Sequence, residues 1–132
     1  MLQKADRFEE EVRGRLAAYP SETVDLVVKR LRDRGILNDR RAAENFVSSR
    51  QGRKSLGSQL VTERLLGRGA PEEVVATATR QVDDRAVALE LLRTQRSLTA
   101  EDRGRAGRML IRKGIDPELV ESVLDQYLEE QL

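Results

Sequence analysis

The sequence predicts an all-α protein, built as an elongated, solenoid-like series of tandem three-helix repeats with about eight helices. Apolar residues recur at helical spacing, and no useful length of the chain alternates with a period of two. Residues that typically start and stop helices separate these segments. A pattern of apolar, acidic and glycine residues also recurs after 45 residues. With 132 residues, the chain is long enough for one continuous structural domain with a real core.

The first two helices are expected at about residues 5–18 and 22–34. Ser21 is the expected N-cap of the second helix. Gly35 is expected to end that helix, because glycine readily adopts the left-handed conformation that follows a C-cap. The apolar residues that define the inward faces are Phe8, Val12, Leu16, Val24, Val27, Val28 and Leu31.

The next three helices follow a repeated pattern of cap, apolar stripe and stop. The third is expected to begin at Asn38 or Asp39, both good N-caps. A basic loop over residues 50–54 leads to a fourth helix at about 55–67, and the fifth begins with Pro71 in its first turn. Their expected core residues are Ala43, Phe46, Val47, Leu56, Leu60, Val61, Leu65, Val74, Val75, Ala78 and Val82.

The last three helices repeat that pattern. The sixth is expected to begin at the cap Asp83–Asp84. Thr99 is expected to cap the seventh, with Asp102 as its capping-box partner, and this helix is expected to end at Gly114. The eighth begins at Asp116–Pro117. The expected core residues are Ala88, Leu89, Leu91, Leu92, Ala106, Met109, Leu110, Leu119, Val120, Val123, Leu124 and Tyr127.

The repeat is visible when residues 38–82 are shifted by 45 onto residues 83–127, which requires no gap. The coincidence of caps, stop glycines and core residues indicates tandem units more strongly than identity alone. We therefore expect an incomplete first repeat at 1–37, which lacks its first helix, a second at 38–82 and a third at 83–132. The eight identical pairs are Asp39/Asp84, Arg40/Arg85, Ala43/Ala88, Leu65/Leu110, Gly69/Gly114, Glu73/Glu118, Val75/Val120 and Gln81/Gln126.

The composition argues against catalysis and against a bound metal or cofactor. The chain has no cysteine and no histidine, which excludes disulfides, thiol nucleophiles, Cys/His metal sites and histidine-based triads. Acidic residues occur as sequence neighbours near helix starts, where they act as caps and dipole partners. No glycine-rich phosphate-binding motif occurs. The first twelve residues contain no long apolar run, so we expect a cytoplasmic protein without a membrane segment.

The charged residues are unevenly distributed along the chain. Residues 29–68 contain 11 basic and 4 acidic side chains, residues 93–113 contain 7 and 2, and residues 114–132 contain 6 acidic and no basic side chains. This segregation suggests a partner with a charged surface, although solvated helix faces explain it too, as do ion pairs between the arginines and the acidic fifth and eighth helices. The candidate partner-binding residues are Arg30, Arg34, Arg50, Arg53, Lys54, Arg64, Arg68, Arg105, Arg108 and Arg112.

Three segments resemble the RecX family of regulatory proteins. The first is RLRDRGILNDRRAAENFVSSR, residues 30–50. The second comprises the basic glycine loop and residues 60–75, and the third residues 110–123. Asn38 and Phe46 stand where the family usually has Asp and Tyr, and Ile115 where the third repeat usually has an aromatic residue. The three-helix repeat agrees with the architecture of that family.

The resemblance implies a non-catalytic modulator of the RecA recombinase, active in DNA repair, DNA recombination and the SOS response. Members bind in the groove of the RecA filament on single-stranded DNA and usually inhibit its recombinase, ATPase and co-protease activities. We therefore expect the RecA filament as partner, weak direct DNA binding at most, and a monomeric chain. The alternative from the basic stretches alone is a direct nucleic-acid-binding helical module. A net charge of +1 and only four aromatic residues weaken that alternative.

Overall fold

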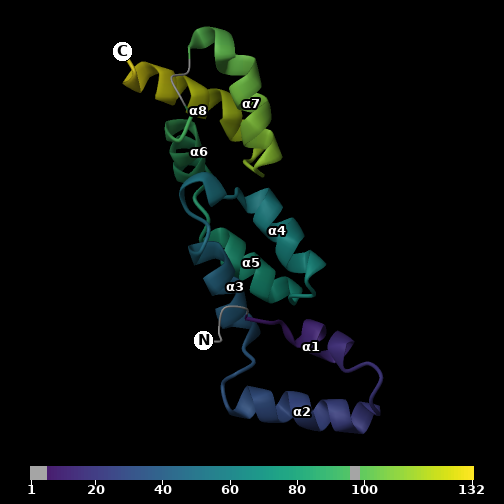
Figure 1. The fold of residues 1–132 in the computed structure, drawn as a ribbon. Coiled ribbons are helices and arrows are strands. Elements are labelled where there is room, and N and C mark those ends of the chain that lie inside the picture. The colour runs from purple at the N-terminus through teal and green to yellow at the C-terminus, as the bar shows by residue number, and fades with distance from the viewer. Residues whose placement is uncertain (1–5, 96–98) are drawn as a thin grey trace.

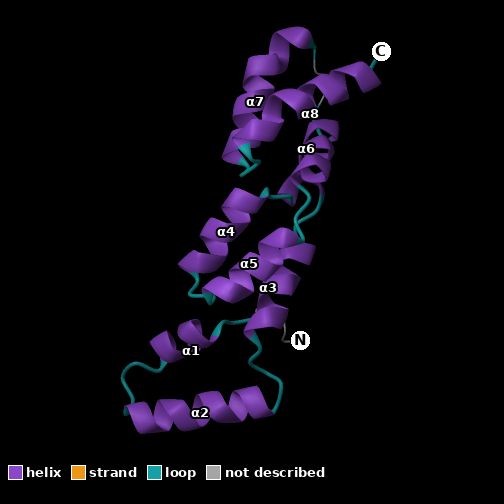
Figure 2. Ribbon diagram, turned by 180° about the vertical axis from the view of Figure 1, so that it is seen from behind, coloured by secondary structure: helices purple, strands orange, loops and turns teal. Residues whose placement is uncertain are grey.

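The structure, a computed structural model, describes residues 6–95 and 99–132. In these residues the chain forms eight α-helices and two short 3₁₀ turns, and no strand, in a long and narrow body (Figure 1). The view from behind shows the helices joined by short loops (Figure 2). The predicted elongated all-α class is therefore confirmed. The helices are α1 (Glu9–Arg15), α2 (Ser21–Asp33), α3 (Asp39–Ser48), α4 (Ser58–Gly67), α5 (Glu72–Arg80), α6 (Asp84–Arg93), α7 (Arg103–Arg112) and α8 (Pro117–Glu130).

The helices pack in three groups along the body. Helices α3, α4 and α5 enclose one apolar core, α6, α7 and α8 enclose another, and α1 pairs with α2. Leu65 and Leu110, one of the identical pairs, have no exposed surface and lie in the two larger cores. Phe8 precedes α1 but is buried in the core of the middle group, which joins the α1–α2 pair to it. The repeat boundaries after residues 37 and 82 stay a prediction.

Helices α7, α4 and α1, one from each group, follow one another end to end along one side of the body (Figure 1). Where α7 meets α4, the backbone N–H of Gly57 donates to the Lys113 carbonyl at 2.7 Å, and that of Gln59 donates to the Gly114 carbonyl at 3.1 Å. Gly114 has a φ of 89°, and a Cβ there would lie 2.4 Å from Leu60 Cβ. A glycine is therefore required at this joint.

Asp39 and Asp84, one of the identical pairs of the repeat, form hydrogen bonds between neighbouring groups. Asp84, the first residue of α6, accepts hydrogen bonds at 2.7 Å from both the backbone N–H and the hydroxyl of Ser58, the first residue of α4. It also accepts from the Asp116 N–H at 3.2 Å. Asp39 in α3 likewise accepts from the backbone N–H of Glu9, the first residue of α1, at 2.8 Å. Asp84 therefore caps α4, and Asp39 caps α1, each a helix of the preceding group.

This finding corrects the predicted role of Asp84 as a cap of its own helix. The cap of α6 is Asp83, which accepts from the Ala86 N–H, and the cap of α3 is Asn38, which accepts from the Arg41 N–H. Because one acceptor suffices at each helix start, the neighbouring aspartate is free to bond to the preceding group.

Several predicted boundaries shift. The helix expected at 5–18 spans Glu9–Arg15, is followed by a turn, and residue 5 lies outside the described residues. The helix expected at 55–67 begins at Ser58, because Gly52–Lys54 forms a 3₁₀ turn and extended backbone leads into α4. Ser21 is the first residue of α2 and not its cap.

The remaining starts and stops mostly agree with the prediction. Gly35 has a φ of 72°, and Asp116 caps α8 ahead of Pro117. Pro71 occupies the N-cap position of α5, one residue before the predicted place. The carboxylate of Asp102 accepts from the Thr99 N–H at 3.0 Å as predicted, although a 3₁₀ turn separates Thr99 from α7.

Candidate partner-binding surface

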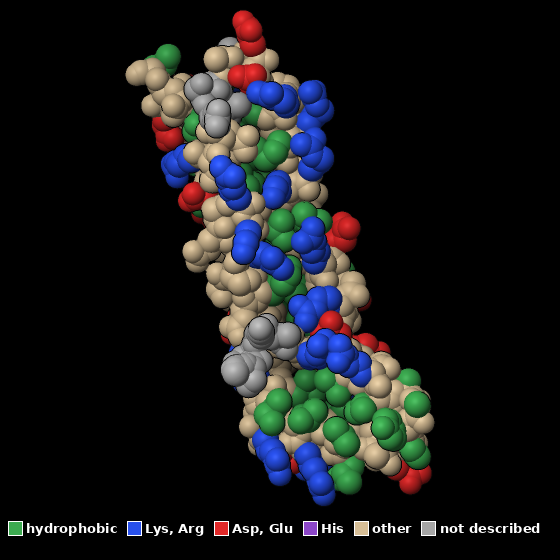
Figure 3. Space-filling view, in the orientation of Figure 1, with side chains coloured by type: hydrophobic (Ala, Val, Ile, Leu, Met, Phe, Trp, Pro, Cys, Tyr) green, Lys and Arg blue, Asp and Glu red, His purple; other side chains and the backbone are tan. Residues whose placement is uncertain are grey.

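The clearest basic stripe lies on α7. Arg105, Arg108 and Arg112 are all exposed, and their spacing of three and four residues places them on one side of the helix, while Leu110 faces the core. Figure 3 shows Lys and Arg side chains gathered along this side of the body, over α7 and α4. Arg105 pairs with Asp102 at 2.8 Å, whereas no carboxylate of the described residues lies within ion-pair distance of Arg108 or Arg112.

The basic loop before α4 meets the end of α7. Arg53 and Lys54 are exposed, and the Arg53 carbonyl accepts a hydrogen bond from Lys113 Nζ at 3.0 Å. An open depression of about 350 Å³ lies at this junction. Its lining combines two cations with the apolar side chains of Leu91 and Met109, which suits a carboxylate or phosphate with an apolar neighbour. Its lining residues are Arg53, Leu91, Thr94, Gln95, Met109 and Lys113.

Arg50, in the same loop, is partly committed to the protein itself. Its guanidinium lies 4.4 Å from the centre of the Phe46 ring, a cation–π contact that fixes the side chain against α3. Its Nε is buried without a hydrogen-bond partner among the described residues. Arg50 is half-buried, and we expect it to be less available to a partner than Arg53.

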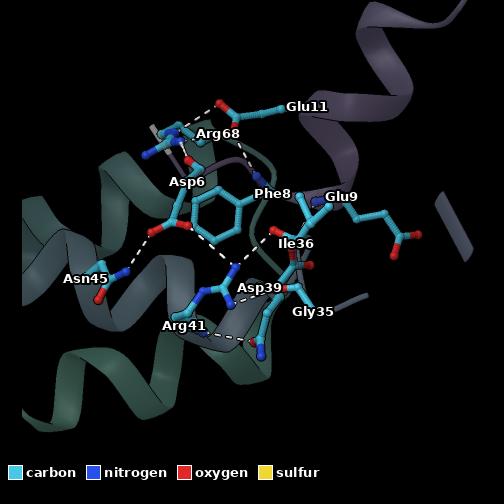
Figure 4. A network of polar contacts seen from close by, with 11 residues as sticks. Asp6, Phe8, Glu9, Glu11, Gly35, Ile36, Asp39, Arg41, Asn45 and Arg68 are labelled. Atoms are coloured by element: carbon cyan, nitrogen blue, oxygen red, sulfur yellow. Dashed lines mark hydrogen bonds and ion pairs between the residues drawn. The ribbon is translucent and has the colours of Figure 1, made fainter. Parts of the chain in front are cut away.

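Arg64 and Arg68, near the end of α4, also differ in how available they are to a partner. Arg64 is exposed. Arg68 donates through Nε and Nη2 to the Glu11 carboxylate, both at 3.0 Å, and through Nη2 to the Asp6 carbonyl at 2.8 Å (Figure 4). Its guanidinium also lies 4.9 Å from the centre of the Phe8 ring. Arg68 therefore holds the segment before α1 against α4.

The ionisation of Glu11 reflects this contact. Burial acts to raise its pKa, but hydrogen bonds from Arg68 and from the Phe8 N–H outweigh burial and hold the pKa below its ordinary value. Glu11 thus stays ionised and keeps Arg68 in place.

A second arginine of this network, Arg41, was not singled out from the sequence. It donates to the Gly35 and Ile36 carbonyls at 2.7 and 2.9 Å and pairs with Asp6 at 3.7 Å (Figure 4). Asn45 donates to the same Asp6 carboxylate at 2.6 Å. These contacts join the end of α2 and the segment before α1 to α3.

Arg30 in α2 and Arg34, which directly follows that helix, are exposed, but α2 lies at the far end of the body from α7 (Figure 1). Neither arginine lies opposite the apolar face of this helix. Arg30 follows Val27 by three residues and Arg34 follows Leu31 by three, so each arginine lies beside an apolar residue. Val27 and Leu31 are themselves only half-buried.

Pairing between arginines and the acidic eighth helix occurs at a residue that was not a candidate. Arg103 of α7 pairs with Glu121 and Asp125 of α8 at 2.6 and 2.9 Å. None of the ten candidate cations forms such a pair with α5 or α8 within the described residues.

Two aliphatic side chains are exposed on the same helices as the basic residues. Leu66 on α4 and Ile111 on α7 are 45% and 51% exposed, and they are 45 residues apart, so they occupy equivalent positions. In the 45-residue repeat they match only in being apolar. Their exposure could not be predicted from the sequence, because each directly follows a buried leucine and is itself apolar.

Other kinds of site find no support in residues 6–95 and 99–132. These residues contain no cluster of three acidic side chains arranged to hold a metal ion. None of their helices is long and apolar enough to cross a membrane.

Fold and surface together define a small helical-repeat protein with a basic, partly aliphatic face. A comparison with protein-family models finds no match. Regulatory protein RecX of Prosthecochloris aestuarii is 28% identical over 125 residues, which cover 90% of this chain and 83% of that protein. Regulatory protein RecX of Mycobacterium ulcerans is 30% identical over 118 residues, which cover 84% of this chain and 68% of that protein.

A crystal structure of RecX from Lactobacillus salivarius has the same fold, with a TM-score of 0.77 at 17% identity over 96% of this chain and 88% of that one. Sequence and fold thus agree, and the chain belongs to the RecX family of regulatory proteins.

Proposed function

We propose that this chain is a non-catalytic, cytoplasmic regulator that binds in the groove of the RecA filament on single-stranded DNA and inhibits RecA. Membership of the RecX family supports RecA as the partner. The observation that favours a protein surface over bare nucleic acid is the pair Leu66 and Ile111, exposed on the same two helices, α4 and α7, that carry basic side chains. Phosphates attract arginine but offer an aliphatic side chain nothing to bury against, whereas protein interfaces combine both contacts.

The arrangement of the groups also suits a filament. Helices α4 and α7 follow one another along the body and present Leu66 and Ile111 at equivalent positions. A polymer of identical subunits offers repeated surfaces to such repeated contacts. The basic side chains that we assign to this contact are Arg53, Lys54, Arg64, Arg105, Arg108 and Arg112.

Direct binding to nucleic acid is the second candidate. The depression between Arg53 and Lys113 favours it, because two adjacent cations suit a backbone phosphate. The two candidates differ in salt dependence. A protein with about six phosphate contacts loses roughly 10³-fold in DNA affinity between about 50 and 200 mM salt.

The test is co-sedimentation with RecA filaments on single-stranded DNA, compared with the same DNA alone at low and high salt. The variant is the double reversal Arg108→Glu with Arg112→Glu. Its matched control is Arg40→Glu with Arg80→Glu, which changes the charge equally at exposed positions of α3 and α5. We expect the α7 variant to lose at least tenfold in filament affinity and in inhibition of RecA, and the control to retain both.

Two results would contradict the proposal. The first is undiminished filament binding by the α7 variant with an unchanged melting temperature. The second is equal binding to DNA with and without RecA, with a steep salt dependence, which would support the nucleic-acid module instead.

A further inference from the structure

The open depression where the loop before α4 meets α6 and α7 is lined by cations and by no carboxylate. Two of its six lining residues are basic, two are polar and uncharged, and two are apolar. In that order they are Arg53 and Lys113, Thr94 and Gln95, and Leu91 and Met109. Its volume of about 350 Å³ lies near the lower end of the range for ligand pockets, about 300–1,000 Å³. The depression therefore suits a small anionic group and not a whole helix.

The joint between α4 and α1 contains an equivalent cation. Arg68 and Lys113 are 45 residues apart, and each directly follows its helix, α4 or α7. Arg68 donates to the backbone carbonyl of Asp6, in the segment that leads into α1, at 2.8 Å. Lys113 donates to the backbone carbonyl of Arg53, in the segment that leads into α4, at 3.0 Å. The two side chains therefore occupy equivalent places at the two joints.

The two joints differ in the carboxylate that the cation meets. Arg68 also donates to the carboxylate of Glu11 through two bonds of 3.0 Å, and the Phe8 ring lies beside the same guanidinium (Figure 4). Glu11 is the third residue of α1, whereas the third residue of α4 is Leu60. No carboxylate of the described residues lies within ion-pair distance of Lys113. The joint between α7 and α4 thus lacks the carboxylate that the other joint takes from its own chain.

The comparison favours a protein carboxylate over a phosphate as the occupant. At the other joint the internal occupant is a carboxylate, Glu11, with an apolar neighbour, Phe8. Leu91 and Met109 offer apolar surface to such a neighbour in the depression. None of the six lining residues is aromatic, so a nucleic-acid base finds nothing on which to stack. The exposed guanidinium of Arg53 can donate two parallel hydrogen bonds to one carboxylate.

We propose that this depression binds an aspartate or glutamate side chain of a partner protein, together with an apolar residue next to it in that partner. Arg53 and Lys113 hold the carboxylate, and Leu91 and Met109 contact the apolar neighbour. Under the proposed function, on which this assignment rests for the nature of the partner, the carboxylate belongs to the RecA filament. The assignment adds the chemistry that the partner presents at one defined place.

Met109 supplies a direct reporter of the depression. Met1 is the only other methionine of the chain, so labelling of the methionine methyl groups with carbon-13 gives a simple NMR spectrum. The probe is the peptide acetyl-Leu-Glu-Leu-amide, added to the full chain without RecA. Two comparison peptides have glutamine in place of the glutamate or serine in place of both leucines. Inorganic phosphate and a single-stranded oligothymidylate are the phosphate probes.

The variant is Arg53→Gln, which removes one cation and keeps the backbone carbonyl that accepts from Lys113. The matched control is Lys54→Gln, which removes the same charge from an exposed neighbour that does not line the depression. Circular dichroism melting of both variants checks that folding is retained.

We expect the glutamate peptide to shift the Met109 signal to saturation in the unaltered chain and in Lys54→Gln, with equal affinity. Arg53→Gln should bind the same peptide at least about fivefold more weakly, because it loses one of the two charge contacts. The glutamine and serine peptides should also bind the unaltered chain more weakly, since each lacks one half of the expected contact.

The proposal is overturned if the glutamate peptide leaves the Met109 signal unmoved, or if Arg53→Gln binds it as well as Lys54→Gln does. Equal binding of the glutamine peptide overturns it too. If phosphate or the oligothymidylate shifts the signal at lower concentration than the glutamate peptide does, the depression is a phosphate site and the nucleic-acid module gains support. Because no arm of this test contains RecA, its failure leaves the proposed function standing, and a failure of the co-sedimentation test leaves these NMR outcomes unchanged.

Discussion

Replacing Asp84 with alanine tests the assignment of this residue to the joint between two helix groups. The side chain is about nine-tenths buried and accepts three hydrogen bonds, two from Ser58 and one from the Asp116 backbone. Alanine removes all three acceptor contacts and leaves the first turn of α4 without its cap. Its neighbour Asp83 accepts one hydrogen bond, from the Ala86 N–H at 3.1 Å, and is exposed.

The magnitude follows from these contacts. Loss of an N-cap costs about 1 kcal/mol, and each further hydrogen bond to a charged acceptor contributes at least about 1 kcal/mol. Relief of the burial of a carboxylate offsets a part of this loss. We expect Asp84→Ala to lower the free energy of unfolding by about 3 kcal/mol and Asp83→Ala by about 1 kcal/mol. For a chain of this length, the melting temperature falls by roughly 10 °C and 4 °C.

The assay is thermal and urea unfolding of the two single variants, followed by circular dichroism. Asp83→Ala is a matched control, because it changes the same residue type and charge one position away. A third variant, Asp84→Asn, keeps an acceptor oxygen without the charge and should fall between the other two. If Asp83→Ala destabilises the protein as much as Asp84→Ala does, the assignment of Asp84 to the joint is refuted.

Two further perturbations test the glycine joint and the Glu11 network. Gly114→Ala should lower the melting temperature by several degrees, because Gly114 has a φ of 89° and an added Cβ meets Leu60. Gly67→Ala is the control and should be neutral or stabilising, because nothing lies near its Cβ position; equal melting temperatures for the two would contradict the contact. For Glu11, whose pKa lies below its ordinary value of 4.5, the ionised form stabilises the folded chain above that pH, and the benefit disappears as the pH falls through the lowered pKa. Glu11→Gln should therefore lower the melting temperature near pH 7 and much less near pH 3, and a constant difference at both pH values would show that the charge contributes nothing.

Helical periodicity and the repeat were sufficient to predict the helices and their cores. Leu65 and Leu110 are fully buried, because a stripe at helical spacing has only one side that can avoid water. The α4 start was predicted too early because Leu56 is apolar and buried, and it fits the stripe although it precedes the helix. Extended backbone before a helix can bury a side chain without helical spacing.

The contacts between groups could not be predicted in this way. Asp39 and Asp84 look like ordinary caps, since capping and bonding to another group need the same carboxylate. Their identity in both repeats was the available signal, because Asn38 and Asp83 already supply a cap at each place. Similarly, the sequence places Arg68 with the other cations, whereas its partners Asp6 and Glu11 lie more than fifty residues away in the chain.

The two joints explain why Arg68 differs from the other candidate cations. At the joint between α7 and α4, backbone hydrogen bonds and Asp84 hold the groups together, so that Arg53 contributes only its carbonyl and its guanidinium stays exposed. At the joint between α4 and α1, Asp39 accepts one hydrogen bond from the residues that the structure describes.

Burial raises the pKa of Asp39, and the nearby Glu9 charge adds to this effect, although the hydrogen bond from the Glu9 N–H opposes it. The ionised aspartate is thus a less favourable cap there. The Arg68 contacts with Glu11 and Phe8 add attraction between α4 and the segment around the start of α1. A partner that used Arg68 would have to break this joint, so we expect binding to use the exposed cations of α7 and of the loop before α4 instead.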